Sequence, residues 1–270
     1  MNHDSRPLSA LTIAGSDSGG GAGIQADLKT FAAHGVHGLS AIAALTAQNT
    51  RGVSAIHVPP IGFLHAQIDA CFDDFNIGAV KIGMLANAEV IEAVVEALAQ
   101  QRPPQVVLDP VMVASSGAAL LQGDALDALR LRLLPLATLI TPNIPEAELL
   151  LGHRIADAAA AEAAMGELLR LGAKAVLLKG GHLPQGDEVI DRFDDGSTAA
   201  EFIQDRLAVD GHGTGCTLSA AIAAQLCRGL SLPEACDAAA DYVHGALEGA
   251  YRPGRTTLAV LDHCWQTRQG

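Results

Sequence analysis

The stretch from Ala10 to Phe31 joins a short apolar run to a glycine-rich turn and then to a helical pattern. The run Ala10-Leu11-Thr12-Ile13-Ala14 predicts a buried strand, because it is short, apolar and ends at glycine. Gly15-Ser16-Asp17-Ser18-Gly19-Gly20-Gly21-Ala22-Gly23 follows it directly. Ile24, Leu28 and Phe31 then recur at the spacing of one helix face. The stretch therefore predicts a strand, a turn and a helix in succession.

The same alternation of apolar runs and helical patterns continues along the chain. Further strands are predicted at 39–45, 79–82, 106–108, 138–140 and 175–178, and helices at 63–75, 88–100, 126–134, 145–151, 157–171, 216–228 and 233–247. Residues 189–193 and 199–203 predict a hairpin. Strands separated by helices pair in parallel through right-handed crossovers. We therefore expect one α/β domain over residues 1–270, a three-layer α/β/α sandwich with a mostly parallel central sheet.

Composition narrows the classes of partner and compartment. The chain has 30 acidic and 17 basic residues and a formal net charge of −13, which predicts no nucleic-acid and no membrane partner. Hydrophobic residues make up 49%, enough for a folded core. The five cysteines form no C-x-x-C pair, and residues 1–10 lack the apolar segment of a signal peptide. These features predict reduced thiols and a cytoplasmic location.

A second glycine-rich segment, His212-Gly213-Thr214-Gly215-Cys216-Thr217-Leu218-Ser219, leads directly into a predicted helix. Helix N-terminal amides attract anions, and glycines allow close approach of a ligand to the backbone. The segment is suited to a transferring phosphoryl group, and its position predicts a lowered pKa for the Cys216 thiol. The structural alternative makes Thr214 or Thr217 a helix cap and Cys216 a small core residue.

Polar residues also follow three other predicted strands. Asp109 ends one strand, and Asn143 and Glu146 follow another, where carboxylate and amide oxygens suit Mg²⁺. The structural alternative is that Asn143 caps a helix and Glu146 is an acidic residue in the first turn of that helix. Lys179 follows the next strand and is placed to contact phosphate, or else is a solvated loop lysine.

The first glycine cluster fits a close approach to a ligand or a flexible connection. It is not a dinucleotide-binding fingerprint, because Ile24 stands at the third glycine position and Gln48 stands where an acidic residue is required. No Gly-Lys-Ser/Thr follows it, so it is not a P-loop either.

Taken in this order, these motifs resemble the ribokinase superfamily of ATP-dependent small-molecule kinases. Closer still is the resemblance to the hydroxymethylpyrimidine/phosphomethylpyrimidine kinases of thiamine biosynthesis, which extends over roughly residues 11–250. It is carried by residues 13–30, 44–50, 81–84, 108–112, 140–146, 178–182 and 212–221. The resemblance implies a ribokinase-like fold, commonly dimeric. The reaction that it implies is transfer from ATP to 4-amino-5-hydroxymethyl-2-methylpyrimidine and then to the monophosphate.

The resemblance also implies residue roles. Gln48 would contact the pyrimidine edge, and the other substrate-binding residues would be Gly15, Asp27 and Met84. Asp109 and Glu146 would act with Mg²⁺, and Asn143 and Lys179 with the ATP phosphates. The anion hole would comprise Gly213, Thr214, Gly215 and Cys216.

Cys216 distinguishes branches of the superfamily, because sugar kinases carry an aspartate there as the general base. A cysteine fits the pyrimidine kinases and also a group of pyridoxal kinases. Our hypothesis is that a Cys216 thiolate takes the hydroxyl proton in the first transfer, whereas the second acceptor is already anionic. Gln48 favours an aminopyrimidine, because an amide both donates to a ring nitrogen and accepts from an amine.

Three segments depart from the family pattern: residues 210–211, the short hairpin at 189–203, and the tail at 252–270, which lacks the usual histidine-containing ending. They put lid behaviour in doubt but are expected to leave the residues assigned to chemistry untouched. Pyridoxal kinase activity and a non-catalytic ligand sensor stay as alternatives. From the length we expect no fused thiamine-phosphate synthase module.

Overall fold

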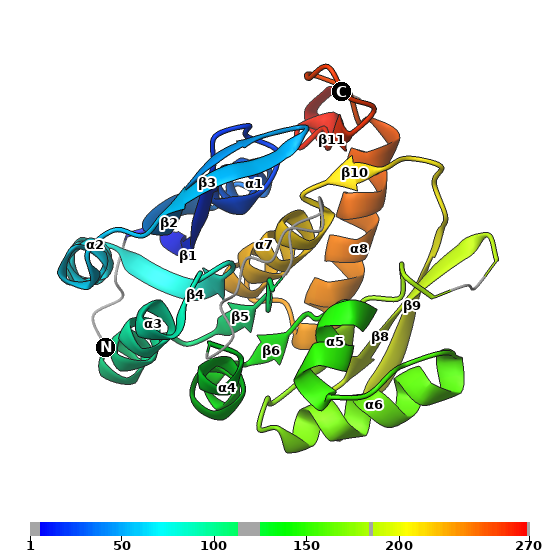
Figure 1. Ribbon diagram of the computed structural model, residues 1–270, viewed down its shortest axis with the longest axis horizontal. Coiled ribbons are helices and arrows are strands. Elements are labelled where there is room, and N and C mark those ends of the chain that lie inside the picture. Colours follow the sequence, from blue (N-terminus) through cyan, green and yellow to red (C-terminus); the bar gives the residue numbers. More distant parts are fainter. Residues whose placement is uncertain (1–5, 113–124, 184–185, 269–270) are drawn as a thin grey trace.

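Nine strands form one central sheet in the computed structural model, which describes residues 6–112, 125–183 and 186–268. The sheet order is β3-β2-β1-β4-β5-β6-β7-β8-β9 (Figure 1). The strands are β1 Leu8–Asp17, β2 His37–Asn49, β3 Gly52–His57, β4 Asn76–Ile82, β5 Val106–Leu108, β6 Leu139–Ile140, β7 Val176–Leu178, β8 Glu188–Asp194 and β9 Ala199–Asp205. Six neighbouring strands of the sheet pair in parallel, in the order β2-β1-β4-β5-β6-β7. At the two edges of the sheet, β3, β8 and β9 are antiparallel to their neighbours.

Helices cover both faces of this sheet, which confirms the predicted three-layer sandwich. One face carries α1 Gly23–Ala33, α7 Thr214–Cys227 and α8 Leu232–Glu248, and the other carries α2 Ile61–Asp74, α3 Ala88–Gln101, α4 Ala125–Ala128, α5 Ile144–Leu151 and α6 Ala158–Arg170. Successive strand residues point to opposite faces, so Leu11 and Ile13 pack toward α3 while Ala10 packs toward α7. The assignment of residues 1–270 to one domain stays a prediction, which the continuous sheet supports.

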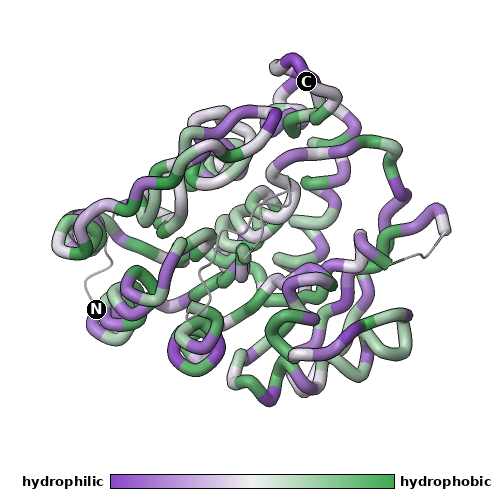
Figure 2. The backbone as a smooth tube through the Cα atoms, in the orientation of Figure 1, coloured by the Kyte–Doolittle hydropathy of each residue, from purple (hydrophilic) through white to green (hydrophobic). Residues whose placement is uncertain are grey.

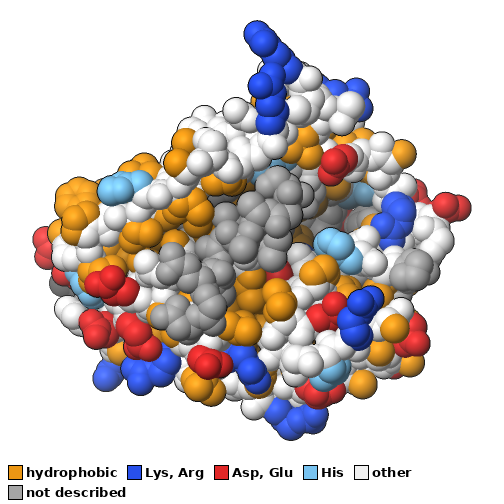
Figure 3. Space-filling view, viewed as in Figure 1, with side chains coloured by type: hydrophobic (Ala, Val, Ile, Leu, Met, Phe, Trp, Pro, Cys, Tyr) orange, Lys and Arg blue, Asp and Glu red, His pale blue; other side chains and the backbone are white. Residues whose placement is uncertain are grey.

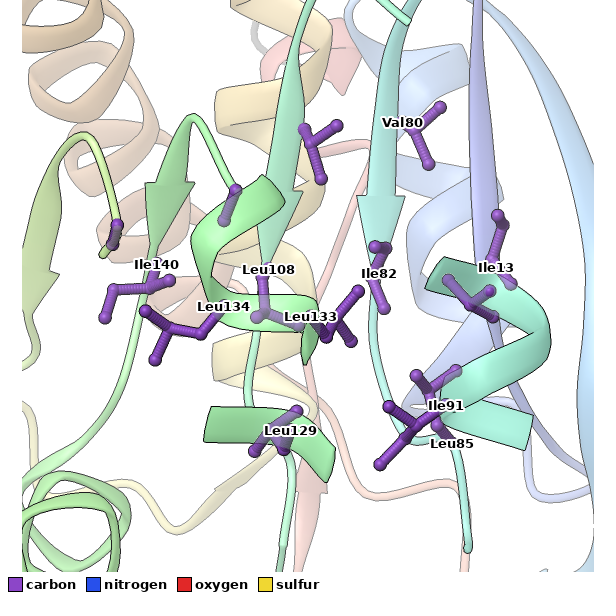
Figure 4. Close-up of a cluster of buried hydrophobic side chains, with 14 of the residues drawn as sticks. Ile13, Val80, Ile82, Leu85, Ile91, Leu108, Leu129, Leu133, Leu134 and Ile140 are labelled. Atoms are coloured by element: carbon purple, nitrogen blue, oxygen red, sulfur yellow. The ribbon is translucent and has the colours of Figure 1, made fainter. Parts of the chain in front are cut away.

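The core on the α3 and α4 side consists of aliphatic side chains from strands and helices together. Ile82 and Leu108 on neighbouring strands belong to one buried cluster with Ile91 and Leu133, and Leu133 lies next to Leu108 in Figure 4. Figure 2 shows that hydrophobic and hydrophilic residues alternate along the helices of the outer layers, as expected for helices with one face against the sheet and the other in solvent. None of the helices in the described ranges is long and apolar enough to cross a lipid bilayer.

Three elements of the structure differ from the sequence prediction. The expected helix at 126–134 is a short α4, a π-helical turn at Leu129–Leu133 and a 3-10 turn at Leu134–Leu136, because Pro135 cannot continue a regular helix. Strand β3 had no apolar run to reveal it, since it is an edge strand whose side chains are largely exposed. Strand β2 also runs on to Asn49, so Gln48 lies within a strand.

The C-terminal tail returns to the start of α7. Its strand β11, Ala259–Val260, pairs with β10, Gly211–His212, immediately before the second glycine-rich segment. A 3-10 turn, Trp265–Arg268, follows. His263 in this tail is buried and lies 3.1 Å from the Thr217 hydroxyl in the first turns of α7. The divergent tail therefore supports the helix that begins at the predicted anion hole.

Candidate active site

A cleft of about 680 Å³ lies at the carboxyl ends of the parallel strands, where open α/β sheets bind ligands. The N-terminus of α7, the β8–β9 hairpin and α8 close its other sides. The cleft is lined by Gly15, Gln48, Met84, Asp109, Asn143, Glu146, Lys179, Gly213, Thr214, Gly215 and Cys216. Of the predicted site residues, only Asp27 is not part of this lining. Figure 3 shows basic and acidic side chains interspersed on the face of the molecule that is seen in Figure 1.

Lys179 stands between two carboxylates in the cleft. Its Nζ lies 2.9 Å from Asp109 Oδ1 and 3.7 Å from Glu146 Oε2. Burial alone would lower the pKa of Lys179, but the charges of Asp109 and Glu146 outweigh it and raise that pKa. Burial raises the pKa of Glu146, with Asp109 adding to the rise and Lys179 opposing it. The predicted phosphate contact and the two predicted metal ligands thus form one charged cluster.

Asn143 and Glu146 also form the capping box of α5, so the structural alternative is observed together with the cleft position. The Asn143 side chain accepts from the Glu146 amide at 2.8 Å, and Glu146 Oε2 accepts from the Asn143 amide at 2.8 Å. The cap fixes both side chains on a rigid helix terminus. The Lys179 amide donates to Pro142 O at 2.9 Å, which ties the lysine to the same turn.

The two carboxylates of this cluster provide oxygen donors of the kind that a divalent cation binds. Within the described residues, no three His, Cys, Asp or Glu side chains converge on one point. Mg²⁺ commonly takes one or two protein carboxylates and completes its shell with waters and phosphate oxygens. Asp109 and Glu146 are buried and already share the ammonium of Lys179, so they form an oxygen-donor site that is compensated by positive charge. Their chemistry fits Mg²⁺ bound together with a phosphorylated ligand.

The N-terminus of α7 has the backbone geometry of an anion site. Gly213 is the N-cap, has φ 87°, and carries no side chain that could cap the helix amides. A Cβ at Gly213 would lie 2.0 Å from the carbonyl oxygen of Gly21, so the two glycine-rich turns pack directly together. A Cβ at Gly215 would lie 3.0 Å from Lys179 Nζ. The helix terminus therefore points at the same place as the lysine–carboxylate cluster.

The predicted lowering of the Cys216 thiol pKa is wrong. Burial raises the pKa of Cys216 to about 11, and Asp27 and Asp109 add to the rise. Lys81 and the Gly23 amide favour the thiolate but do not offset the burial. The thiol is thus protonated at neutral pH, although it lies in the first turn of α7.

The first glycine-rich turn has its amides occupied by its own carboxylate. Asp17 accepts from the amides of Gly19 at 2.7 Å, Gly21 at 3.0 Å and Ala22 at 2.9 Å. Burial works against the charge, but the hydrogen bond from His212 and those from Gly19 and Ala22 lower the pKa of Asp17. These glycines therefore shape the wall of the cleft, whereas no side chain in the described part of the chain caps the amides at the α7 terminus.

Gly15, Met84 and Gln48 lie together on the side of the cleft formed by β1 and β2. A Cβ at Gly15 would lie 2.7 Å from Met84 Sδ, so a larger residue there would displace the methionine. The Gln48 amide lies 3.0 Å from Thr46 Oγ1 and 3.2 Å from His212 Nε2. This arrangement agrees with the predicted pocket for a small ring.

Asp27 lies behind the cleft in an ion pair that the residue patterns did not reveal. Its Oδ2 accepts from Lys81 Nζ at 3.0 Å and from Thr12 Oγ1 at 2.6 Å, and both charged side chains are fully buried. Lys81 does line the cleft, and it acts electrostatically on Cys216. Asp27 therefore lies behind the cleft wall and not in it, and it neutralises the buried charge of Lys81, which does line the cleft.

Several further cleft residues were missed by motif analysis. His212 joins Asp17 to Gln48, and the hairpin contributes Asp191 and Arg206. Arg206 donates to the carbonyl oxygens of Gly181, Leu183, Gly186 and Glu188, which shapes the loop beyond Lys179. The divergent residues Asp210 and Gly211 also line the cleft, closer to the chemistry than we expected. The hairpin pattern was visible, but nothing in it indicated which strand end turns toward the cleft.

Comparison with known proteins agrees with this geometry. The family model described as phosphomethylpyrimidine kinase matches residues 17–260. A hydroxymethylpyrimidine/phosphomethylpyrimidine kinase of Rhizobium meliloti is 53% identical, covering 95% of this chain and 98% of the relative. A thiamine biosynthesis bifunctional protein of Geobacter sulfurreducens is 52% identical, covering 92% of this chain and 50% of that protein.

Among solved structures, the ADP complex of Bacillus subtilis pyridoxal kinase superposes with a TM-score of 0.88. It is 33% identical, with 98% of this chain and 100% of that chain covered. Fold and site together define a ribokinase-like small-molecule kinase. More specifically, the chain belongs to the phosphomethylpyrimidine kinase family. The resemblance and the enzyme class predicted from the sequence are thereby confirmed.

Proposed function

We propose that this chain transfers the γ-phosphoryl group of ATP to 4-amino-5-hydroxymethyl-2-methylpyrimidine, and then to the resulting monophosphate, in thiamine biosynthesis. One observation carries the proposal. A single cleft joins the open N-terminus of α7 and the Lys179 cluster to a small pocket beside Gln48 and Met84. The first two features bind a transferring phosphoryl group, and the third positions a small aromatic acceptor.

The residue roles that we propose follow from position. The α7 amides from Gly213 to Cys216 receive the developing negative charge, and Lys179, beside Asn143, contacts phosphate as a compact cation. Asp109 and Glu146 would hold Mg²⁺, which supplies neutralisation of phosphate charge when it is bound. Gln48, Gly15 and Met84 hold the ring, and Asp27 acts through Lys81.

Cys216 acts as a neutral hydrogen-bond donor in this proposal, which replaces our hypothesis of a thiolate base. A thiol with a pKa of about 11 keeps its proton at neutral pH. Phosphoryl transfer passes through a loose transition state, so the hydroxyl proton leaves late, and in the first transfer it passes to an oxygen of the transferred phosphoryl group. The second acceptor is already an anion. A protonated thiol beside the helix amides is therefore compatible with both transfers.

The test is product analysis by mass spectrometry after incubation with ATP, Mg²⁺ and hydroxymethylpyrimidine. We expect the monophosphate first and the diphosphate later, and we expect Lys179→Met to slow both transfers strongly, because a phosphate contact and the partner of Asp109 are lost. Binding without any transfer would refute the kinase proposal and favour a ligand sensor.

Pyridoxal is a second candidate substrate, because the superposed Bacillus subtilis structure is a pyridoxal kinase. A pyridine that carries a hydroxymethyl arm has a similar shape. The same assay with pyridoxal compares the two rings. Phosphorylation of pyridoxal alone would reassign the substrate.

We also propose a homodimer, as the family resemblance implies, and a cytoplasmic location, as the cysteine pattern predicts. Light scattering coupled to size-exclusion chromatography tests the dimer, since a chain of 27.7 kDa would elute with twice that mass. Cell fractionation with an antibody against the native chain tests the compartment.

A further inference from the structure

Five side chains and backbone groups form a continuous polar chain across the substrate side of the cleft. His212 Nε2 lies 3.1 Å from Asp17 Oδ2 and 3.2 Å from Gln48 Nε2. The Gln48 amide oxygen lies 3.0 Å from Thr46 Oγ1, which in turn lies 2.9 Å from the carbonyl oxygen of Ser16. The hydrogen-bonding capacity of each group limits where the protons in this chain lie.

The Asp17 end determines the state of His212. Three backbone amides hold Asp17 as a carboxylate, and a carboxylate only accepts hydrogen bonds. At 3.1 Å from Asp17, His212 Nε2 must therefore carry a hydrogen. The Gln48 amide nitrogen beside it also carries only hydrogens, so two donors face each other there.

The Thr46 end has the opposite mismatch. The Thr46 hydroxyl has a single proton, but both the Ser16 carbonyl oxygen and the Gln48 amide oxygen are acceptors within reach. Thr46 can donate to only one of them, which leaves the other oxygen facing a lone pair. Both mismatches involve the same amide group.

A half-turn of the Gln48 amide relieves both conflicts. Its oxygen then shares the single His212 Nε2 hydrogen with Asp17 Oδ2 in a three-centre hydrogen bond. Its nitrogen donates to Thr46 Oγ1, which donates to the Ser16 carbonyl oxygen. We propose that His212 is a positioning residue that fixes the Gln48 amide in this orientation, and that the fixed amide selects a ring nitrogen next to an amino group. The inference rests on the proposed function for the identity of the ring.

The orientation has a consequence for the substrate. The Gln48 nitrogen, on the Thr46 side, donates to the ring nitrogen, and the Gln48 oxygen, on the His212 side, accepts from the amine. In 4-amino-5-hydroxymethyl-2-methylpyrimidine the hydroxymethyl arm is attached to the carbon next to the one that bears the amine. The arm therefore lies on the side of His212, where the chain continues into Gly213–Cys216. A 4-oxo analogue presents a donor and an acceptor in the reverse order and is rejected.

Nuclear magnetic resonance of the ligand-free protein tests the proton positions without any use of activity. With ¹⁵N-labelled histidine, we expect the His212 Nε2 signal to be that of a protonated nitrogen. The Gln48 side-chain NH₂ protons should show contacts to the Thr46 methyl group and not to the His212 ring. An unprotonated Nε2, or contacts to the ring only, would overturn the inference whatever the enzyme phosphorylates.

Kinetics with matched variants test the selection. His212→Gln keeps an N–H donor at the same reach, whereas His212→Leu removes it and frees the amide to turn. The readout is the ratio of kcat/KM for the amino substrate to that for the 4-oxo analogue. We expect His212→Leu to reduce this ratio by about 10-fold or more, mainly through KM, and His212→Gln to stay within about 3-fold of wild type.

Two outcomes contradict the positioning role. An unchanged ratio in His212→Leu would show that the amide is oriented without His212. An equal loss in both variants would show that His212 matters for packing and not as a donor. A wild-type enzyme that phosphorylates neither pyrimidine would refute the proposed substrate, and the magnetic resonance experiment would still decide the orientation of Gln48.

Discussion

The buried ion pair between Lys81 and Asp27 separates a structural role for Asp27 from the substrate contact that the family resemblance implied. Both side chains are fully buried, and their charged atoms lie 3.0 Å apart. Asp27 Oδ1 has no hydrogen-bond partner within the described part of the chain, so the carboxylate depends on Lys81 and Thr12 at its other oxygen. The change Asp27→Asn removes the charge and keeps the shape.

The expected loss follows from the uncompensated ammonium. Removing one partner of a buried ion pair costs about 3–5 kcal/mol, because the other charge stays buried. An asparagine oxygen still accepts from Lys81 and Thr12, so we expect the lower end, about 3 kcal/mol. With a urea dependence of about 3 kcal/mol per molar for a chain of this size, the unfolding midpoint falls by about 1 M.

The assay is urea unfolding followed by circular dichroism, with Lys81→Met and the double variant as controls. Removing both charges leaves no lone ion, so the double variant should be at least about 2 kcal/mol more stable than the sum of the single losses predicts. If Asp27→Asn unfolds at the wild-type urea concentration and only raises KM for the pyrimidine, Asp27 contacts substrate and the reasoning fails.

Three other predictions concern Cys216, the glycines at the start of α7, and His263 in the C-terminal tail. Cys216→Ser keeps a hydrogen-bond donor and should retain most of the rate. Cys216→Ala should lose about 10- to 100-fold in kcat for both transfers, measured from the products formed. Equal rates in wild type and both variants would show that the thiol has no part in the mechanism. Gly213→Ala should lower the melting temperature, because Gly213 has a positive φ and the added methyl group would clash with the Gly21 carbonyl oxygen. Gly215→Ala should keep the wild-type melting temperature but reduce the rate, because the added methyl group would displace the Lys179 ammonium. Burial lowers the pKa of His263 to about 4, so between pH 6.5 and 4 the unfolded chain binds a proton there that the folded chain does not. Unfolding free energy should therefore fall by about 2 kcal/mol more between pH 7 and pH 5 in wild type than in His263→Gln, and parallel urea titrations would contradict this.

Features that depend on local pattern were predictable from the sequence. Short apolar runs ended at Asp109, Thr141 and Lys179, and parallel strands place such ends along one edge of the sheet. The Lys179–Asp109–Glu146 cluster follows from that topology alone. The capping box was equally readable, because the spacing of Asn143 and Glu146 is that of an N-cap and its third residue.

Features that depend on contacts between side chains distant in the sequence were not predictable. Asp17 looked like one polar residue in a glycine turn, yet it binds three amides of that turn and His212 from a segment 195 positions away. Lys81 looked like the end of a strand and is the partner of a buried acid. In both cases the decisive contact joins segments distant in sequence, which periodicity and spacing do not record.

The Cys216 pKa shows why a correct motif led to a wrong prediction. A helix N-terminus stabilises a nearby anion by up to about 2 kcal/mol, or roughly 1.5 pKa units. Burial can shift a pKa by about 3–5 units in the opposite sense, so burial prevails once the thiol is enclosed. This balance gives the site a property that an aspartate would lack. A neutral thiol adds no negative charge beside the helix amides, and an acceptor that is itself a phosphate monoester meets less repulsion there. If the proposed anion site serves two successive transfers, it therefore favours a neutral cysteine over a carboxylate at position 216.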